Sequence, residues 1–492
     1  MSSSLLNNYL QSKSPSEYKP ETLAYLASLE VIGKDNPQIV ESILSELKDQ
    51  RSSLKMIASE NYCSLAVQLT LGNLLTDKYA EGYPQHRFYA GCDNIDTIES
   101  LAIEKAKKLF GAHHAYVQPH SGADANLVAF WTILTKRFED KFFDQFDKKT
   151  VMDFDDAQWE EYRQAVGNQK LMGLSLDCGG HLTHGFRQNL SAKMFKYCAY
   201  GVNPETQLID YDEVRKIAKR EKPLILLGGY SAYPRKINFK IFREIADEVG
   251  AVLMVDMAHF AGLVAGKVFT GDFDPVAHAQ IVTSTTHKTL RGPRGGIILT
   301  DEEFATTVDR GCPMALGGPL SNAMAAKAVA FEEASTDSYK EYAQKVVDNA
   351  RVLGEALIKE GIKITTNGTD NHLIVADITS FGITGRQGEG ALREAGVTLN
   401  RNSIPFDPNG AWYTSGLRLG TPALTSRGFG EDEMKTIASV IKKVLSCTAP
   451  KTTKSGKPSK ATFSYDESIV AAARAEVDEM LSVKPLYPEL DF

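Results

Sequence analysis

Two residues in the middle of the chain have types suited to the same chemistry. Lys288 ends the hydroxyl-rich run Val282–Lys288 and precedes the glycine-rich segment Gly292–Gly296, and Asp256 ends the apolar run Ala251–Val255. A lysine among small residues can form a Schiff base with an aldehyde cofactor, and an acid at a strand end can keep a pyridinium nitrogen protonated. The pair therefore predicts pyridoxal phosphate chemistry, although either residue alone would more often be a surface lysine or a helix-capping aspartate.

The elements that must position these residues alternate between short apolar runs and amphipathic stretches. The amphipathic stretches include Tyr211–Lys219 and Phe239–Val249. The expected strands are Ala115–Val117, Leu171–Leu174, Leu224–Leu227, Ala251–Val255, Ile281–Val282 and Gly296–Leu299. This rhythm is typical of an α/β fold with a mostly parallel central sheet flanked by helices. Ligands in such folds lie beyond the carboxyl ends of the strands, where both Asp256 and Lys288 fall.

The remaining segments predict four regions along the chain. Residues 1–80 are expected to form an N-terminal helical arm, with one helix over Pro37–Gln50, and residues 81–320 a large α/β domain. A charged and aromatic stretch at residues 136–168 predicts a surface helical insertion with its own apolar cluster.

The C-terminal part is expected to hold a smaller domain and a tail. Residues 321–447 predict a small α+β domain that includes the connecting helices, with strands at Leu373–Asp377 and Val397–Asn400 and a helix at Glu431–Leu445. Residues 448–492 predict a C-terminal extension that begins with a linker, because residues 448–462 are rich in lysine, threonine, proline and serine.

Composition excludes several classes of protein. The chain has 492 residues, of which 43% are hydrophobic, so it can bury a large core. The net charge is −7 and no basic block suggests a nucleic-acid partner. There is no apolar run long enough to span a membrane and no export signal, so no membrane partner is expected. Six scattered cysteines without paired spacing favour reduced thiols in the cytoplasm.

Two further motifs bear on the cofactor. The run His120–Asn126 follows an expected strand and opens a helix, so Ser121 and nearby N–H groups could bind a phosphate, although an ordinary helix cap is as good an interpretation. His181 and His184 lie between glycines, which argues against a helix and against a metal site, and no metal is expected. An imidazole that stacks on a cofactor ring and a structural loop histidine remain alternatives for His181.

Three other residues could serve a substrate. Arg418 is framed by small residues and could bind an amino-acid carboxylate in a bidentate manner, although it could also be a surface arginine. Glu81 is an acid among aromatic residues and suits proton transfer, but this signal is weak by itself. His259 could reach the cofactor or be a satisfied core histidine.

At this point the sequence resembles a known family, serine (glycine) hydroxymethyltransferase, over roughly residues 25–446. The likeness rests on eight blocks in the family's order and spacing: Met56–Tyr62, Lys78–Pro84, Gln118–Gly122, Gly179–Gly185, Val255–His259, Thr285–Leu290 with Gly292–Gly296, Gly317–Leu320 and Leu417–Ala423. It implies a fold-type I pyridoxal phosphate enzyme that moves the hydroxymethyl carbon of serine to tetrahydrofolate and leaves glycine.

The resemblance also implies roles around the cofactor. Lys288 would bind its aldehyde carbon, Asp256 would hold the ring nitrogen protonated, and His181 would stack on the ring. The other cofactor contacts would be Ser121, Gly122, Ala123, Ser231, His259, Thr285, His287, Tyr79 and Gly318. Arg418 with Ser59 would bind the substrate carboxylate and so select which bond at Cα is broken, and Arg294 would order the surroundings of the lysine.

For the folate side, the resemblance implies that Glu81 transfers protons beside Tyr89. Folate would lie against Phe88, Leu176, Gly180, Leu182, Asn402 and Trp412. In the family, the stretch with Tyr79 and Glu81 and the loop with Gly318 serve the neighbouring subunit, so a homodimer or a dimer of dimers is implied.

The sequence departs from the family at two site positions. The family usually has two tyrosines where this chain has Phe88 and Tyr89, so folate stacking is kept while one hydroxyl is lost. Ala123 stands where a serine is common, which removes a phosphate donor and costs about 1 kcal/mol if nothing replaces it.

Other functions stay open on the sequence alone. A folate-independent aldolase acting on threonine would share Lys288, Asp256 and Arg418 but would not need Glu81 or Asn402. A racemase side reaction is also chemically possible. A non-catalytic scaffold protein is disfavoured because the lysine, both acids and the arginine are all present.

Overall fold

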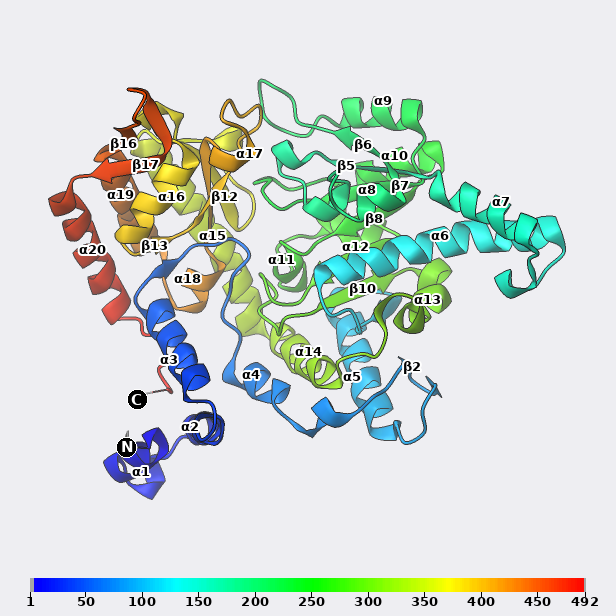
Figure 1. Cartoon of the computed structure of the whole chain (residues 1–492), viewed down its shortest axis with the longest axis horizontal. Helices are drawn as coiled ribbons and strands as arrows, with labels where there is room; N and C mark the ends of the chain where they lie inside the picture. The colour runs from blue at the N-terminus through cyan, green and yellow to red at the C-terminus, as the bar shows by residue number, and fades with distance from the viewer. Residues whose placement is uncertain (1–3, 491–492) are drawn as a thin grey trace.

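A seven-stranded sheet forms the centre of the larger part of the molecule (Figure 1). The structure is a computed structural model that describes residues 4–490. In chain order the strands are β4 (His114–Tyr116), β5 (Lys170–Leu174), β6 (Lys196–Tyr200), β7 (Ile225–Gly229), β8 (Val252–Asp256), β9 (Ile281–Thr285) and β10 (Gly296–Thr300). Their order across the sheet is β4-β10-β9-β8-β7-β5-β6. All neighbours from β6 to β9 are parallel, and only β10 runs antiparallel to its neighbours β9 and β4. The expected mostly parallel α/β sheet is confirmed.

Helices on both faces bury this sheet. They include α5 (Asp93–Phe110), α6 (Gly122–Phe146), α9 (Tyr211–Glu221), α10 (Phe239–Val249), α13 (Glu302–Asp309) and α14 (Ser321–Ala334). Strands β7, β8, β9 and β10 are buried at every position, which explains the apolar runs of β7, β8 and β10 and the absence of an alternating pattern. Strand β9 is equally buried but continues after Ile281 and Val282 with small hydroxyl residues. Helix α10 has the predicted bounds, because Asn238 caps its first turn and Gly250 follows its end in a left-handed conformation.

One strand of the sheet was not predicted from the sequence. Strand β6 is the edge strand beyond β5, and its residues Lys196 and Ala199 are exposed while Tyr200 is buried. An edge strand has one neighbour and less buried surface, so its sequence lacks the continuous apolar run that identifies the central strands.

A four-stranded antiparallel sheet organises the second part of the molecule. Its order is β11 (Lys363–Ile364), β12 (Leu373–Asp377), β15 (Gly416–Gly420) and β14 (Asn400–Asn402). Helices α15 (Asp337–Lys359), α16 (Gly385–Glu394) and α19 (Glu431–Ser446) pack beside it. The segment predicted as one strand at Val397–Asn400 is split, because β13 (Val397–Thr398) pairs with β1 (Leu54–Lys55) and only the following residues join the sheet through β14.

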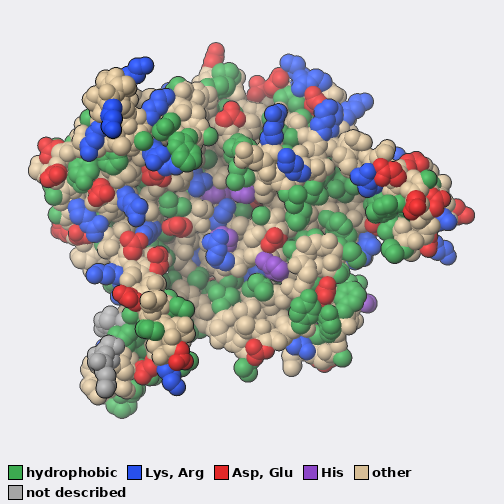
Figure 2. Space-filling view, in the orientation of Figure 1, with side chains coloured by type: hydrophobic (Ala, Val, Ile, Leu, Met, Phe, Trp, Pro, Cys, Tyr) green, Lys and Arg blue, Asp and Glu red, His purple; other side chains and the backbone are tan. Residues whose placement is uncertain are grey.

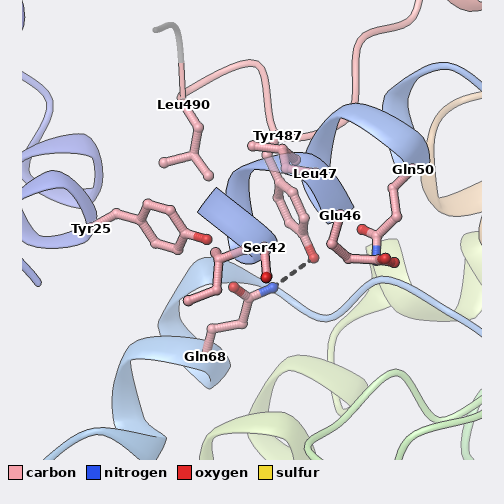
Figure 3. A pocket seen from close by; sticks show the side chains of 9 residues that line it. Tyr25, Ser42, Glu46, Leu47, Gln50, Gln68, Tyr487 and Leu490 are labelled. Carbon is pink, nitrogen blue, oxygen red and sulfur yellow. Dashed lines mark hydrogen bonds between the residues drawn. The ribbon is translucent and has the colours of Figure 1, made fainter. Parts of the chain in front are cut away.

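The N-terminal residues form helices that meet the C-terminal end of the chain. These helices are α1 (Leu5–Ser12), α2 (Pro20–Gly33), α3 (Pro37–Arg51) and α4 (Leu65–Leu71). Figure 3 shows Tyr487 and Leu490 beside α3, where they line a cavity of about 350 Å³ with Tyr25 and Gln68. The amide of Gln68 donates a 2.8 Å hydrogen bond to the hydroxyl of Tyr487. The two ends of the described chain are therefore packed together.

Residues 136–168 extend away from the sheet as a helical projection (Figure 1). Helix α6 continues to Phe146, and α7 (Asp156–Gly167) returns beside it. The ring of Tyr162 packs against the rings of Phe142 and Phe154 with centroid distances of 5.4 and 5.9 Å. These edge-on contacts give the projection an apolar cluster of its own.

The prediction of a linker at residues 448–462 was wrong. These residues belong to a hairpin of β16 (Thr448–Thr452) and β17 (Pro458–Tyr465), and α20 (Glu467–Ser482) follows. The side-chain amide of Gln387 donates to the carbonyl oxygens of Ser459 and Thr462 at 2.8 and 2.9 Å. A lysine-rich composition indicates solvent exposure but does not exclude a hairpin whose inner residues are held by a neighbouring helix.

Candidate active site

The ends of three parallel strands bring the first site residues together. Asp256 is the last residue of β8 and is paired in register with Gly229 of β7 and Thr283 of β9. Lys288 follows the end of β9 at Thr285 by one short turn. Because carboxyl ends of parallel strands meet at one edge of a sheet, both functional groups lie at that edge. Figure 2 shows histidine, lysine and arginine side chains gathered in the hollow between the two sheet-containing parts.

Asp256 is buried and held by two side-chain donors. Its Oδ2 accepts from Nδ2 of Asn126 at 2.9 Å and from Nε2 of His184 at 3.1 Å. Burial alone would raise the pKa of Asp256, but the hydrogen bond and field of His184, with His181 and Asn126, hold that pKa below its ordinary value. Asp256 is therefore a fixed anion, as required to pair with a protonated ring nitrogen.

The loop with the two histidines fixes the proton positions around Asp256. A short 3-10 helix spans Leu182–His184, and the backbone N–H of His181 donates to Nδ1 of His184 at 3.3 Å. His184 thus uses both ring nitrogens, one as acceptor and one as donor to Asp256. The ligand atoms of His181, His184 and Asp256 lie within 4.8 Å of one another, a spacing that a metal ion could also use. The occupied nitrogens of His184 favour the support of Asp256 over metal ligation.

His181 lies beside this pair and is partly buried. Its Nδ1 is 2.7 Å from Oγ1 of Thr183, which in turn accepts from Nδ2 of Asn126 at 2.8 Å. Burial, with the nearby ring of His184, lowers the pKa of His181 to about 4. A neutral imidazole held in this way suits contact with a flat cofactor ring.

Lys288 is placed for reaction as a free amine. Burial lowers the pKa of its ammonium group to about 8, while Asp256 opposes that change and the cations Arg418 and Arg294 add to it. Its backbone carbonyl accepts from Nδ2 of Asn61 at 2.9 Å, which fixes the turn after β9. A lysine with a lowered pKa has a larger neutral fraction at neutral pH, and the neutral amine is the nucleophile.

Arg418 joins the small sheet to the end of β7. It lies on β15, and its Nη1 donates to the carbonyl oxygen of Ser231 at 2.8 Å and to the hydroxyl at 3.2 Å, while Nε donates to Asn400. Among residues 4–490, its Nη2 makes no hydrogen bond, so it can receive a carboxylate. Burial lowers the pKa of Arg418 to about 10 and leaves it a cation at neutral pH.

His259 connects the same region to a histidine that the sequence interpretation missed. Its Nε2 is 3.5 Å from the hydroxyl of Ser231, and its Nδ1 is 3.2 Å from Nε2 of His372, which precedes β12. Burial lowers the pKa of both imidazoles, so the stacked pair is neutral. His259 follows β8 of the large sheet and His372 precedes β12 of the small sheet, so this pair connects the two sheets.

The start of α6 has the form of an anion-binding site. The hydroxyl of Ser121 accepts from the backbone N–H of Asp124 at 3.1 Å, and the helix that it caps has 25 residues. A Cβ atom at Gly122 would lie 2.6 Å from Cγ2 of Thr285, so only glycine lets this turn approach β9 so closely. Nδ1 of His287 is buried without a hydrogen-bond partner among the described residues. These features, with Ala123 in the same turn, fit the phosphate end of pyridoxal phosphate.

Ser59 lies near the strand of Arg418, while Arg294 is exposed. Ser59 follows Ala58, which packs against Gly420 so closely that a Cβ atom there would collide with it. Arg294 lies in the loop between Lys288 and β10, and its charge helps, after burial, to lower the pKa of His287 to about 3.

A second group of predicted residues lies elsewhere in the chain. Glu81 precedes the hairpin of β2 (Gly82–Tyr83) and β3 (His86–Arg87), which Figure 1 shows at the edge of the molecule beside α5. The rings of Tyr79 and Tyr89 are 5.2 Å apart, and a Cβ atom on Gly318 would lie 2.8 Å from Tyr79. Tyr79, Tyr89 and Phe88 are each at least half exposed. Within residues 4–490, none of these residues makes a hydrogen bond with Lys288, and Glu81 is not among the charged groups that shift the pKa of Lys288.

The residues predicted for folate are divided between the two parts of the molecule. Leu176 and His181 line a cavity of about 460 Å³, Leu182 is exposed nearby, and Gly180 packs against the backbone of Leu174. Asn402 ends β14 in the small sheet. Trp412 is 65% exposed and lies 5.8 and 5.9 Å from the guanidinium groups of Arg386 and Arg401.

Three functional side chains escaped the sequence interpretation. Asn126 and His184 hold Asp256, and His372 holds His259. A signal existed for Asn126, since it is a polar residue within the apolar face that includes Ala125 and Val128. His184 and His372 act across long sequence separations, which periodicity does not report.

Comparisons with known proteins agree with this geometry. The family model described as serine hydroxymethyltransferase matches residues 32–143 and 161–441. A protein of Treponema pallidum is 58% identical over 491 residues, covering 100% of this chain and 86% of its own. One of Cutibacterium acnes is 58% identical, covering 95% and 96%, and one of Chlamydia trachomatis is 49% identical, covering 99% of each. All three carry the name serine hydroxymethyltransferase. The chain therefore belongs to the serine hydroxymethyltransferase family.

Proposed function

We propose that this chain transfers the hydroxymethyl carbon of serine to tetrahydrofolate, with pyridoxal phosphate as cofactor. The products are glycine and 5,10-methylenetetrahydrofolate, so the enzyme acts in one-carbon and amino-acid metabolism. The observation that carries the proposal is the buried anion Asp256, supported by His184, at the same sheet edge as Lys288 with its lowered pKa.

The cofactor fits between the strand ends and the start of α6. Lys288 would bind its aldehyde carbon, Asp256 its ring nitrogen, and His181 one face of its ring. When bound, pyridoxal phosphate supplies an aromatic ring that accepts the electrons of the bond broken at Cα. Ser231 and His259 would contact the side of the ring that bears its phenolic oxygen. The phosphate contacts would be Ser121, Gly122, Ala123, Thr285 and His287.

Arg418 would set the geometry of the substrate. Its free Nη2 and the nearby Ser59 would bind the carboxylate of serine. A substrate held at its carboxylate has less freedom to rotate in the site. By fixing the carboxylate, Arg418 would determine which bond at Cα is aligned for cleavage and would so select the reaction. Arg294 adds positive charge beside Lys288.

Glu81 would transfer a proton near the hydroxyl of serine, beside Tyr89. Because neither Glu81 nor Tyr89 makes a hydrogen bond with Lys288 within residues 4–490, we infer that each site is completed by the neighbouring subunit of a homodimer or a dimer of dimers. The exposed aromatic rings of Tyr79, Phe88 and Tyr89 support this inference, since exposed apolar groups clustered on one edge are typical of an interface. Gly318 and Tyr79 would reach the partner's cofactor.

Folate would lie between the exposed ring of Phe88 and the residues that follow β5. Leu176, Gly180 and Leu182 support the proposal by lining or bordering the cavity beside His181. Asn402 and Trp412 would contact it from the small sheet.

The six cysteines form no disulfide, which supports a reducing compartment such as the cytoplasm. No helix of residues 4–490 is long and apolar enough to cross a membrane.

The proposed function is tested by measuring glycine formation from serine with and without tetrahydrofolate. Transfer predicts that glycine formation depends on folate. A folate-independent aldolase predicts the same rate in both reactions and efficient cleavage of threonine. Equal rates with and without folate would contradict the proposed acceptor.

A further inference from the structure

A buried lysine outside the reaction site contacts the backbone that leads into Ser121. Lys327 lies on α14, has an exposed fraction of 1%, and directs its ammonium group at three carbonyl oxygens. Its Nζ is 2.6 Å from the oxygen of Val117, 2.9 Å from that of Pro119 and 2.9 Å from that of Gly296. An ammonium group has three N–H donors, so all three are used.

The three carbonyl oxygens belong to two segments that meet at the expected phosphate site. Val117 and Pro119 precede Ser121, and Gly296 begins β10 after the glycine-rich loop. The N–H of Gly296 donates to the oxygen of Pro119 at 2.9 Å, so this oxygen accepts two hydrogen bonds. Lys327 on α14 therefore connects the two segments through hydrogen bonds.

The hydrogen bond to the carbonyl oxygen of Pro119 also fixes the direction of the N–H of His120, because both belong to one planar peptide unit. In a trans peptide the C=O and the following N–H point in opposite directions. Because Lys327 holds the oxygen of Pro119, the N–H of His120 is directed away from α14. The imidazole Nε2 of His120 and Nδ1 of His287 are both buried without partners among the described residues. Unsatisfied buried nitrogens beside a long helix N-terminus indicate that an anion completes this site.

Lys327 places a buried amine among small and apolar neighbours. The neighbouring buried residues of α14 are small or apolar, such as Met324, Ala330 and Phe331. Burial lowers the pKa of Lys327 to about 7, and the charge of Glu99 opposes that change. Desolvating a charged amine costs free energy, and the three hydrogen bonds to carbonyl oxygens offset that cost.

We propose that Lys327 is a positioning residue for the phosphate group of the cofactor, acting through the backbone of residues 117–122 and 295–296. This inference rests on the proposed function, which assigns the phosphate to Ser121, Gly122 and His287. Lys327 would not touch the phosphate. It would hold the N–H groups of the loop in the orientation that binds it.

The test compares the affinity of apoprotein for pyridoxal phosphate and for pyridoxal, which lacks the phosphate. In Lys327→Met, the affinity for pyridoxal phosphate should fall about tenfold or more, as for lost hydrogen bonds to a charged group, while that for pyridoxal changes less than about twofold. Inorganic phosphate should compete with pyridoxal phosphate in the wild type and lose this effect in the variant. Lys327→Gln, which keeps an amide donor, should lie between the two proteins.

Arg427→Met is the matched control. Arg427 is also a buried cation bound to backbone carbonyls, those of Gln50, Arg51 and Leu481, but it joins the N- and C-terminal segments. This variant should lower the melting temperature of the apoprotein and leave the ratio of the two affinities unchanged.

The results distinguish an error in the proposed phosphate site from an error in the proposed role of Lys327. If the wild type itself does not prefer pyridoxal phosphate over pyridoxal, the proposed phosphate site is wrong. If the wild type prefers it and Lys327→Met keeps the same preference, or weakens both ligands equally, only the role of Lys327 is wrong. If Lys327→Met is insoluble, Lys327→Gln supplies the ratio; insolubility of both, not rescued by the cofactor, would mean a structural role and overturn the inference.

Discussion

His184 donates its Nε2 proton to Oδ2 of Asp256 over 3.1 Å, while its Nδ1 accepts from the backbone N–H of His181. The imidazole of His184 thus donates through Nε2 and accepts at Nδ1. It stabilises the carboxylate of Asp256 without neutralising it, and the carboxylate remains able to pair with a protonated pyridine nitrogen.

Replacing His184 tests this support. In His184→Phe, Asp256 loses one of its two side-chain donors while burial is kept, so the pKa of Asp256 should rise and the cofactor should bind about tenfold more weakly. Equilibrium dialysis of pyridoxal phosphate measures the effect. His113→Phe, which changes a histidine before β4, is the control and should bind as the wild type does; equal weakening in both variants would contradict the role of His184.

The pH dependence of cofactor capture reports on Lys288. Its pKa in the folded protein is about 8, below the ordinary value of 10.5, so the amine is mostly protonated below pH 8 and mostly neutral above it. The rate at which apoprotein binds pyridoxal phosphate covalently should rise through about pH 8 and then level off. Stopped-flow absorbance measures this rate. A rise that begins only near pH 10 would show that burial does not act on this lysine as proposed.

Removal of Lys288 should abolish both the visible absorbance and turnover. Lys288→Ala lacks the amine that binds the aldehyde, so the yellow colour should be lost and serine-to-folate transfer should fall by about 10²-fold or more. Lys267→Ala, in a turn after α11 (Ala261–Ala265), is the control and should retain colour and rate. Borohydride trapping followed by mass spectrometry should find the cofactor on Lys288 of the wild type and on no other residue.

The shared site is tested by mixing two inactive variants. Glu81→Gln should bind the cofactor normally but lose about 10²-fold or more of its folate-dependent rate. When Glu81→Gln and Lys288→Ala chains are denatured and refolded together, hybrid dimers should contain one site with both native residues. Recovered activity supports a site built from two subunits. If the mixture stays as inactive as its components, Glu81 serves its own chain.

Even the conservative substitution Arg418→Lys should reduce activity. Arg418→Lys keeps a positive charge but loses the planar group that contacts Ser231 and Asn400 and would bind the substrate carboxylate, so kcat/KM for serine should fall about 10- to 100-fold. Steady-state kinetics should show the change mainly in KM. Arg351→Lys on the exposed face of α15 is the control, with no expected change.

Much of the fold could be predicted because the central strands are buried on both faces. The run Ala251–Val255 before Asp256 is apolar throughout, and the helix Phe239–Val249 has a strong single-sided pattern. The strand at Ile281 shows this signal only in its first two residues, because Thr283, Ser284 and Thr285 follow. The lysine-rich hairpin at Thr448–Tyr465 could not be predicted in this way. The hairpin is held by hydrogen bonds from Gln387 on α16, and the composition of the hairpin segment does not indicate them.

By itself, the sequence determined which groups are available for chemistry and where they stand relative to strand ends, because residue type and local periodicity are properties of short segments. It pointed to Lys288, Asp256 and Arg418 for this reason. Only the tertiary structure decided which groups support them: His184 and Asn126 on Asp256, His372 on His259, and Lys327 beneath Ser121. These pairs are far apart in the chain, and their hydrogen bonds exist only after the two sheets and their helices have packed.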